Sequence, residues 1–360
     1  MDIGVKRNAD IIISSLSFLL SILLMSTMLA SIGVMSSSIS SGIQLAIVGL
    51  VTLVEIVVKK NVSVSLVIGL AAVIGCAVIN LAPYMLSLAM IISLTNILSR
   101  INSETLKSVA NRLFYVMFIA FILVIILNRM TGFGEVDISI WRINRLVSRQ
   151  SLGFVQPNVT LLTWLGIIFL GVFSCDAVGK RRTIRYAIMM VMTFFLYKYT
   201  VSRTSTYVAT FVLMTSFFWG NKYLNLRSVQ LINLLPLSVF TVSIDTLFSS
   251  KFDSFNSILS GRISLYRQFY AQYGVSMTKE SALENAMFDN GYLQALLAKG
   301  WLFTILEMTI FMTILHGIKR LRVSSAVIYI AFFLVGFTET ALQRFELLIP
   351  LIMCISFDRV

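Results

Sequence analysis

Apolar residues follow one another in long runs along this chain, and short polar connections separate most of the runs. A helix needs about 20 apolar residues to cross the roughly 30 Å of hydrocarbon in a bilayer. The pattern therefore predicts an all-α polytopic membrane protein, with residues 1–360 forming a single integral membrane domain. We expect about twelve transmembrane helices, near residues 11–31, 41–58, 62–79, 82–98, 112–128, 160–175, 185–201, 204–220, 228–246, 299–316, 324–339 and 345–357.

Two polar connections are much longer than the others, at residues 129–159 and 247–298. Lysine and arginine are enriched in cytoplasmic loops, so the short connections that carry them indicate orientation. Among the basic residues in alternate connections are Lys59, Lys60, Lys180, Arg181, Arg182, Lys319 and Arg320. This distribution predicts cytoplasmic N- and C-termini and puts both long connections on the outer face.

The composition agrees with this class. Hydrophobic residues make up 58% of the 360 residues and charged residues only 12%, against roughly 25% charged in soluble domains. In a soluble protein the net charge of +13 would indicate nucleic-acid binding. Here the basic residues mark cytoplasmic loops, so we expect no nucleic-acid partner. The three cysteines lie in apolar runs and the chain has one histidine, so neither disulfides nor a Cys/His metal site is expected.

Arginines on the outer face are the exception to this charge pattern. Arg203 and Arg344 each fall in an outer connection of only a few residues, where basic residues are normally avoided. The planar guanidinium binds phosphate through two parallel hydrogen bonds and stays charged. An arginine-rich outer surface therefore indicates an anionic ligand, and a lipid-linked phosphate fits best.

The first long connection contains Arg142, Arg145 and Arg149, spaced by three and four residues. On a helix this spacing would form one basic stripe. One interpretation is a ligand-binding face, and the other is an amphipathic helix that lies on anionic lipid headgroups. In the second case, Gly153 and Pro157 would simply end that helix and begin the next span.

The second long connection carries Arg262, Tyr266, Arg267 and Tyr270 at helical spacing. Arginine suits phosphate and aromatic rings suit sugar faces, so this face would fit a sugar phosphate. The alternative is a surface helix whose tyrosines lie in the interfacial belt of the membrane.

Two carboxylates are candidates for acid–base chemistry. Asp289 stands shortly before the apolar helical pattern that starts at Tyr292, where it is either an N-cap or a general base at the membrane surface. Glu339 lies five residues before Arg344 at the outer end of a predicted span. It either pairs with that arginine or acts as a second carboxylate at the mouth of a cavity.

Several motifs are missing from the sequence. It contains no Walker A pattern, no DxD or acidic loop cluster, and no GxSxG or HExxH. ATP-driven transport, a metal-bound nucleotide-sugar donor and common hydrolase sites are therefore disfavoured. We expect no cofactor.

Four local stretches resemble one family: RQSLGFVQPN at 149–158, SRTS at 202–205, SGR at 260–262 and DNGYLQALLAKGW at 289–301. Together with the topology, they make the chain similar to bacterial O-antigen and capsular polysaccharide repeat-unit polymerases (the Wzy type), which are related to the O-antigen ligases. The resemblance implies a GT-C-like membrane fold with two large outer loops and a location in the bacterial plasma membrane.

The resemblance also implies a metal-independent, inverting glycosyltransferase. A glycan on undecaprenyl diphosphate would be transferred to a new lipid-linked oligosaccharide repeat unit at the outer face of the membrane. Asp289 is the candidate base, with Glu339 second. The candidate diphosphate- and glycan-binding residues are Arg149, Arg262, Arg203, Arg267, Arg145, Arg142, Arg344, Tyr266 and Tyr292. The partners would be this lipid-linked oligosaccharide and the bilayer, with binding of a chain-length regulator or flippase left open.

Two other functions stay open. An O-antigen ligase would use the same donor, although related ligases carry histidine near the position of Asp289. A flippase or transporter for lipid-linked oligosaccharides would also have about twelve spans. Transporters usually contain repeats and broken helices near the midplane, whereas no repeat relates the two halves of this sequence.

Overall fold

The computed structural model describes residues 3–59, 64–79, 83–142, 145–175, 179–258, 261–283, 286, 288–316 and 318–359. The first elements are α1 (Ile3–Ser31), α2 (Ser37–Lys59), α3 (Val64–Ile79), η1 (Pro83–Met85), α4 (Leu86–Leu98), α5 (Ser103–Thr131), β1 (Asp137–Arg142), β2 (Arg145–Gln150), α6 (Pro157–Phe173), α7 (Lys180–Thr200) and α8 (Arg203–Trp219). The others are β3 (Tyr223–Leu224), α9 (Leu226–Asn233), α10 (Leu235–Phe248), η2 (Ser250–Phe252), α11 (Asp253–Ile258), α12 (Arg262–Tyr273), η3 (Ser281–Leu283), α13 (Gly291–Leu293), the π-helix η4 (Gln294–Ala298), α14 (Lys299–Ile314), β4 (Leu321–Arg322), α15 (Val323–Thr338) and α16 (Phe345–Arg359).

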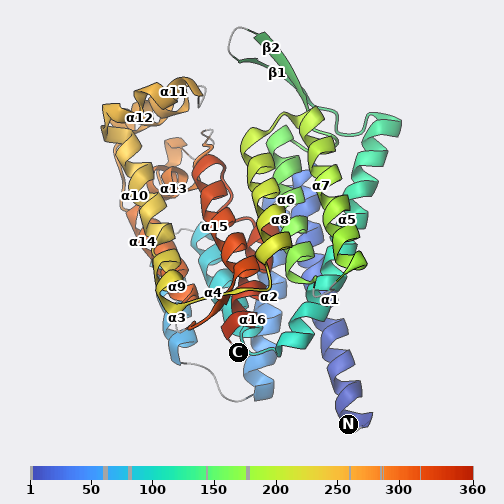
Figure 1. The fold of residues 1–360 in the computed structure, drawn as a ribbon. Helices are drawn as coiled ribbons and strands as arrows, with labels where there is room; N and C mark the ends of the chain where they lie inside the picture. The colour runs from blue at the N-terminus through green and yellow to red at the C-terminus, as the bar shows by residue number, and fades with distance from the viewer. Residues whose placement is uncertain are drawn as a thin grey trace.

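The long helices stand side by side in a bundle, and both ends of the chain lie at the same end of it (Figure 1). The β1–β2 hairpin and the short helices α11 and α12 lie at the opposite end (Figure 1). We call these the terminus end and the hairpin end. The two long connections of the sequence thus meet at one end of the molecule.

The helices follow the hydrophobic pattern closely. Each of the twelve predicted ranges overlaps at least one helix of the described chain. Four helical stretches are long and apolar enough to cross a membrane, namely Ile13–Ser31, Ser103–Thr131, Leu226–Phe248 and Gly291–Ile314. The class of an all-α, membrane-embedded protein is confirmed, while twelve spans and a GT-C-like arrangement stay predictions.

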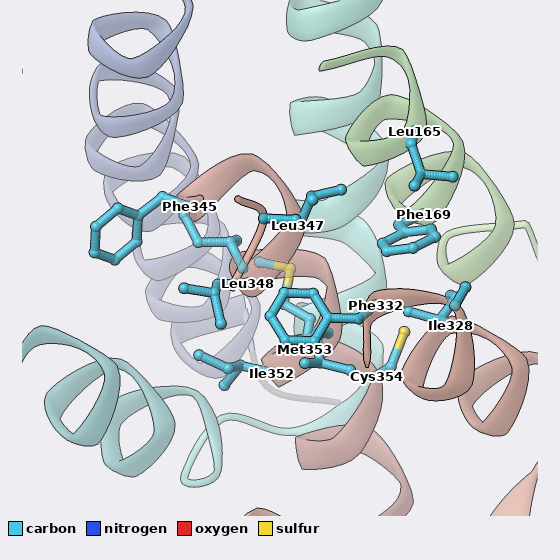
Figure 2. Packing of buried hydrophobic residues seen from close by; sticks show 14 of the residues in the cluster. Leu165, Phe169, Ile328, Phe332, Phe345, Leu347, Leu348, Ile352, Met353 and Cys354 are labelled. Carbon is cyan, nitrogen blue, oxygen red and sulfur yellow. The ribbon is translucent and has the colours of Figure 1, made fainter. Parts of the chain in front are cut away.

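Helix α16 lies at the centre of the bundle, with every residue from 345 to 356 buried. It packs against α4, α5, α6 and α15. In Figure 2, Leu347 and Met353 of α16 lie among Phe169 of α6 and Phe332 of α15. Gly166 allows α6 to approach closely, because a Cβ there would lie 2.4 Å from the carbonyl oxygen of Glu346. This packing fixes the start of α16 and therefore the connection at 339–344 that precedes it.

In the connection at 129–159, Arg142, Arg145 and Arg149 lie on strands and not on a helix, so the predicted basic stripe is wrong. The two strands form an antiparallel hairpin in which Ile138 pairs with Arg149 and Arg142 pairs with Arg145. The physical reason is the local pattern: β-branched Ile138 and Ile140 alternate with polar residues, and this period of two favours a strand. The hairpin carries its chain back to the bundle, with Arg149 near the returning end.

Residues 151–157 turn the chain from β2 into α6. Leu152 and Gly153 have φ values of 55° and 94°, and a Cβ at Gly153 would lie 3.0 Å from Val124 Cγ1 of α5. The Thr160 hydroxyl donates to the carbonyl of Ser151 at 2.6 Å. This tight turn against α5 holds Arg149 over the end of the bundle.

Candidate functional site

Four residues singled out from the sequence meet at the hairpin end: Arg149, Arg262, Asp289 and Glu339. They come from β2, the start of α12, the segment before α13 and the residue just past α15. The charges of Arg149, Arg262 and Asp289 all act on the carboxyl group of Glu339. We call these four residues, with Asn158 and Tyr266, the charged cluster.

Arg262 and Asp289 form the outer part of the charged cluster. Arg262 Nε lies 2.8 Å from Asp289 Oδ2, and their side chains are 33% and 19% exposed. Gly261 before Arg262 has φ 80°, a left-handed conformation that suits glycine and begins α12. The pair is therefore partly exposed to solvent.

Tyr266 supports Asp289 from one turn further along α12. The backbone N–H of Asp289 donates to the Tyr266 hydroxyl oxygen at 2.9 Å, and the Tyr266 ring stacks on Phe288 with centroids 5.8 Å apart. Burial raises the pKa of Tyr266 to about 12, so its hydroxyl stays neutral. Its proton remains available for a hydrogen bond to a ligand oxygen.

Arg149 and Glu339 form the inner part of the charged cluster. Arg149 Nε donates to the Thr200 carbonyl at 2.7 Å, and its Nη2 donates to Asn158 Oδ1. Asn158 Nδ2 in turn donates to Glu339 Oε2 at 3.2 Å. Arg149 is only 7% exposed and Glu339 only 6%. Arg149 thus points into the protein, toward the ends of α6, α7 and α15.

The two carboxyl groups have raised proton affinity. Burial raises the pKa of Glu339 to about 7, the negative charge of Asp289 adds to the rise, and Arg262, Arg149 and Asn158 oppose it. Burial also raises the pKa of Asp289, against the nearby charges of Arg262 and Arg149. A carboxyl group with a pKa near neutral can exchange a proton at physiological pH.

A small pocket opens beside the Arg262–Asp289 pair. It is lined by Thr246, Arg262, Ile263, Tyr266, Asp289, Asn290, Phe337 and Thr338. Its volume is about 20 Å³, which is room for about one water molecule. The pocket lies between α12 and the end of α15, and it has no room for a ligand larger than water.

Asp289 does not cap the helix that follows it. The capping residue is Asn290, whose Oδ1 accepts from the backbone N–H groups of Tyr292 and Leu293 at 3.0 Å each. The N-cap alternative for Asp289 is therefore wrong. The Asp289 carboxylate instead faces Arg262 and the pocket.

Arg267 and Arg344, two further predicted binding residues, have other partners. Arg267 donates to the carbonyls of Thr246 and Ser249 at 3.0 and 2.7 Å and pairs with Asp253 at 2.6 Å. It thereby joins α12 to the end of α10. Arg344 donates to Glu346 Oε1 at 2.5 Å and to the Ser31 hydroxyl at 2.9 Å. The alternative of a Glu339–Arg344 pair is wrong.

Among the remaining predicted residues, neither Arg203 nor Tyr292 has a hydrogen bond or ion pair with the charged cluster. Arg203 is exposed at the first residue of α8. Tyr292 is fully buried in the core, and its hydroxyl donates to the Phe333 carbonyl at 3.3 Å. The backbones of Arg142 and Arg145 lie at the far end of the hairpin, and their side chains are outside the described part of the structure.

Sequence reasoning did not identify Asn158, which bridges Arg149 and Glu339. It lies within RQSLGFVQPN, where only Pro157 was interpreted, as the start of the next span. The sequence signal was weak: a polar amide directly after Pro157 in an otherwise apolar helix. Among the described residues, no group of three or more His, Cys, Asp and Glu is placed to hold a metal ion.

Comparisons with protein-family models, with curated proteins and with solved structures found no match for this chain.

Proposed function

We propose that the protein is a polysaccharide polymerase that extends a glycan on undecaprenyl diphosphate. The observation that carries the proposal is the partly exposed Arg262–Asp289 pair, backed by the buried Arg149 and Glu339, at one end of a membrane-embedded helical bundle. Two arginines can neutralise a diphosphate, and a carboxylate beside them can accept a proton. These are the groups that transfer from a lipid diphosphate requires.

The reaction needs one bond exchange and one proton transfer. A hydroxyl of the acceptor repeat unit attacks the anomeric carbon of the donor glycan. The new carbon–oxygen bond forms as the bond from that carbon to the diphosphate oxygen breaks, and the lipid diphosphate leaves with the electron pair. Asp289 accepts the hydroxyl proton. Attack from the side opposite the leaving group inverts the anomeric centre.

The Arg262–Asp289 ion pair links donor binding to base strength. In the described conformation Arg262 lowers the proton affinity of Asp289, against the effect of burial. A diphosphate that pairs with Arg262 draws the guanidinium away from the carboxylate. Asp289 then loses its stabilising cation within a partly buried site, so its pKa rises and it becomes a stronger base. Proton acceptance is thus favoured once the donor is bound.

Arg149 does not line the pocket, and it acts on the reaction through its positive charge. Its side chain is held by the Thr200 carbonyl and Asn158, so its positive charge has a fixed position. Such a preorganised charge stabilises the anion that develops on the leaving diphosphate. Glu339 balances this charge and, with a pKa of about 7, serves as a second proton site.

The membrane arrangement is part of the same proposal. Strand β2 and helix α12, which carry Arg149 and Arg262, lie at the end opposite both chain termini (Figure 1). This is the outer end if the termini are cytoplasmic. We propose about twelve spans, a GT-C-like arrangement and a place in the bacterial plasma membrane. The substrates would be undecaprenyl-diphosphate-linked oligosaccharides, and no cofactor takes part.

Reconstitution tests this function directly. Purified protein in liposomes receives only lipid-linked repeat units, and the glycans are separated on a gel. The polymerase proposal predicts a ladder of longer glycans. Translocation of the lipid without a change in glycan length would identify a flippase instead. Transfer that occurs only after lipid A or a protein is added as acceptor would identify a ligase.

A further inference from the structure

We infer that a groove between α5 and α7, at the terminus end of the bundle, binds one anionic phospholipid of the surrounding bilayer. The groove has a volume of about 790 Å³ and lies between the faces of these helices that carry Lys107 and Arg185. Helix α5 is one of the helices that are apolar and long enough to span a membrane. The groove therefore opens where lipid is available.

The inner part of the groove is apolar and elongated. Phe118 and Ile119 of α5 and Ile188 and Met189 of α7 line it. Ile119 and Ile188 are about half exposed, as expected for side chains that face hydrocarbon. From Lys107 to Ile119 the helix rises by twelve steps of about 1.5 Å, or about 18 Å. That length matches one leaflet of hydrocarbon, about 15 Å, and so fits one acyl chain.

The end of the groove nearest the chain termini is cationic. Lys107, Arg181 and Arg185 line it, and none of the described residues that line the groove is acidic. The Arg185 side chain donates to Asn111 Oδ1 at 2.8 Å and to the Ser174 hydroxyl at 3.3 Å. These partners are neutral, so they orient the guanidinium without cancelling its charge.

Aromatic rings further restrict two of these cations. The guanidinium carbon of Arg185 lies 4.2 Å from the centroid of the Phe114 ring, and Lys107 Nζ lies 4.4 Å from that of Phe357. Such contacts hold a cation in position. Because the positive end and the apolar wall belong to one groove, a single molecule with a phosphate head and a hydrocarbon tail fits both.

The shape favours a phospholipid over a polyprenyl phosphate. A polyprenyl chain of the kind proposed for the donor is far longer than the apolar wall, whereas an acyl chain is not. Basic pockets between helices at the cytoplasmic side are a known way to hold anionic headgroups. The groove lies at the opposite end from Arg262 and Asp289, so this inference does not depend on the proposed function.

Lipid retention tests the inference. The intact protein is reconstituted in vesicles of equal parts phosphatidylglycerol and phosphatidylcholine and purified in mild detergent, and the retained lipid is counted by native mass spectrometry. The expected result is about one phosphatidylglycerol per chain. The Lys107→Gln/Arg181→Gln double variant should retain at least tenfold less. Ile188→Trp, which fills the groove without changing charge, should also lose the lipid.

Matched controls separate this site from general surface charge. Lys222 and Lys319 are exposed residues outside the groove, and the Lys222→Gln/Lys319→Gln double variant should retain the lipid as the wild type does. Equal losses in both double variants, or equal retention of the two lipids, would overturn the inference. With polyprenyl phosphate added to the vesicles, its preferential retention would also overturn it.

Discussion

Arg149 of β2 and Glu339 just past α15 are bridged by one side chain, that of Asn158. Its amide oxygen accepts from Arg149 and its amide nitrogen donates to Glu339. The bridge connects the base of the hairpin to the connection before α16, two segments that are far apart in the sequence. It places a buried positive charge and a buried carboxyl group directly behind the Arg262–Asp289 pair.

The raised pKa of Glu339 predicts a pH dependence of stability. Its pKa rises from an ordinary value of 4.5 to about 7 in the folded protein, so the folded state binds the proton more tightly. The contribution of Glu339 to the free energy of unfolding is fully present below about pH 4.5. It is lost as the pH rises through about 7, and the loss amounts to at most about 3 kcal/mol. Thermal unfolding in detergent should show a falling midpoint across this window.

The matched variant for that measurement is Glu339→Gln. Glutamine stays neutral and can still bond to Asn158, so its midpoint should change less between pH 5 and pH 8. Parallel slopes for wild type and variant would show that Glu339 is not the titrating group.

Asp289→Asn should abolish chain growth and leave the fold intact. The substitution removes the proton acceptor, and the cap of the following helix is unaffected because Asn290 makes it. Asn290→Ala instead removes the cap itself and should cost about 1 kcal/mol of stability. Chain growth and thermal midpoint are measured for both. Normal chain growth with Asp289→Asn would remove Asp289 as the base.

Arg262→Gln should reduce chain growth about a hundredfold, because the leaving diphosphate loses the cation that binds it. Arg262→Lys should recover only part of this activity, since an ammonium lacks the planar fork. Lys251→Gln, an exposed change of the same charge in the same long connection, is the control and should be active. The glycan ladder from liposomes is the readout, and equal ladders for Arg262→Gln and the control would contradict the role.

Gly153→Ala should destabilise the turn that positions Arg149. The residue has φ 94°, and the new Cβ would lie 3.0 Å from Val124 Cγ1 and 3.2 Å from Asn128 Cβ. The expected loss is about 1–3 kcal/mol, seen as a lower thermal midpoint. Gly42→Ala is the control, because a Cβ there meets nothing within 4 Å. Similar midpoints for both variants would show that the turn tolerates a side chain.

The helices were predictable because a long apolar run has few possible backbone structures in a membrane other than a helix. The connection at 129–159 was not, since its arginine spacing matched a helix while its β-branched residues at Ile138 and Ile140 matched a strand. The strand forms because two neighbouring strands at the hairpin end can make hydrogen bonds between their backbone groups. The break between α9 and α10 beside Pro236 was likewise not anticipated.

The candidate site was predictable in part. Arg149, Arg262, Asp289 and Glu339 were identified by charge in an apolar chain, and the structure brings them together. Charge alone could not show which arginines serve the fold, so Arg267, which joins α12 to α10, was included with them. Nor could it find Asn158, whose importance depends on contacts between residues that are distant in sequence.

The most direct test of the account counts both products of the proposed transfer. Purified protein in liposomes is given one repeat unit on undecaprenyl diphosphate, and mass spectrometry measures glycan dimer and released undecaprenyl diphosphate together. The account predicts one released lipid diphosphate for each new glycosidic bond, and neither product from the Asp289→Asn variant. Wild-type protein that yields no dimer, or dimer formation that survives Asp289→Asn unchanged, would contradict it.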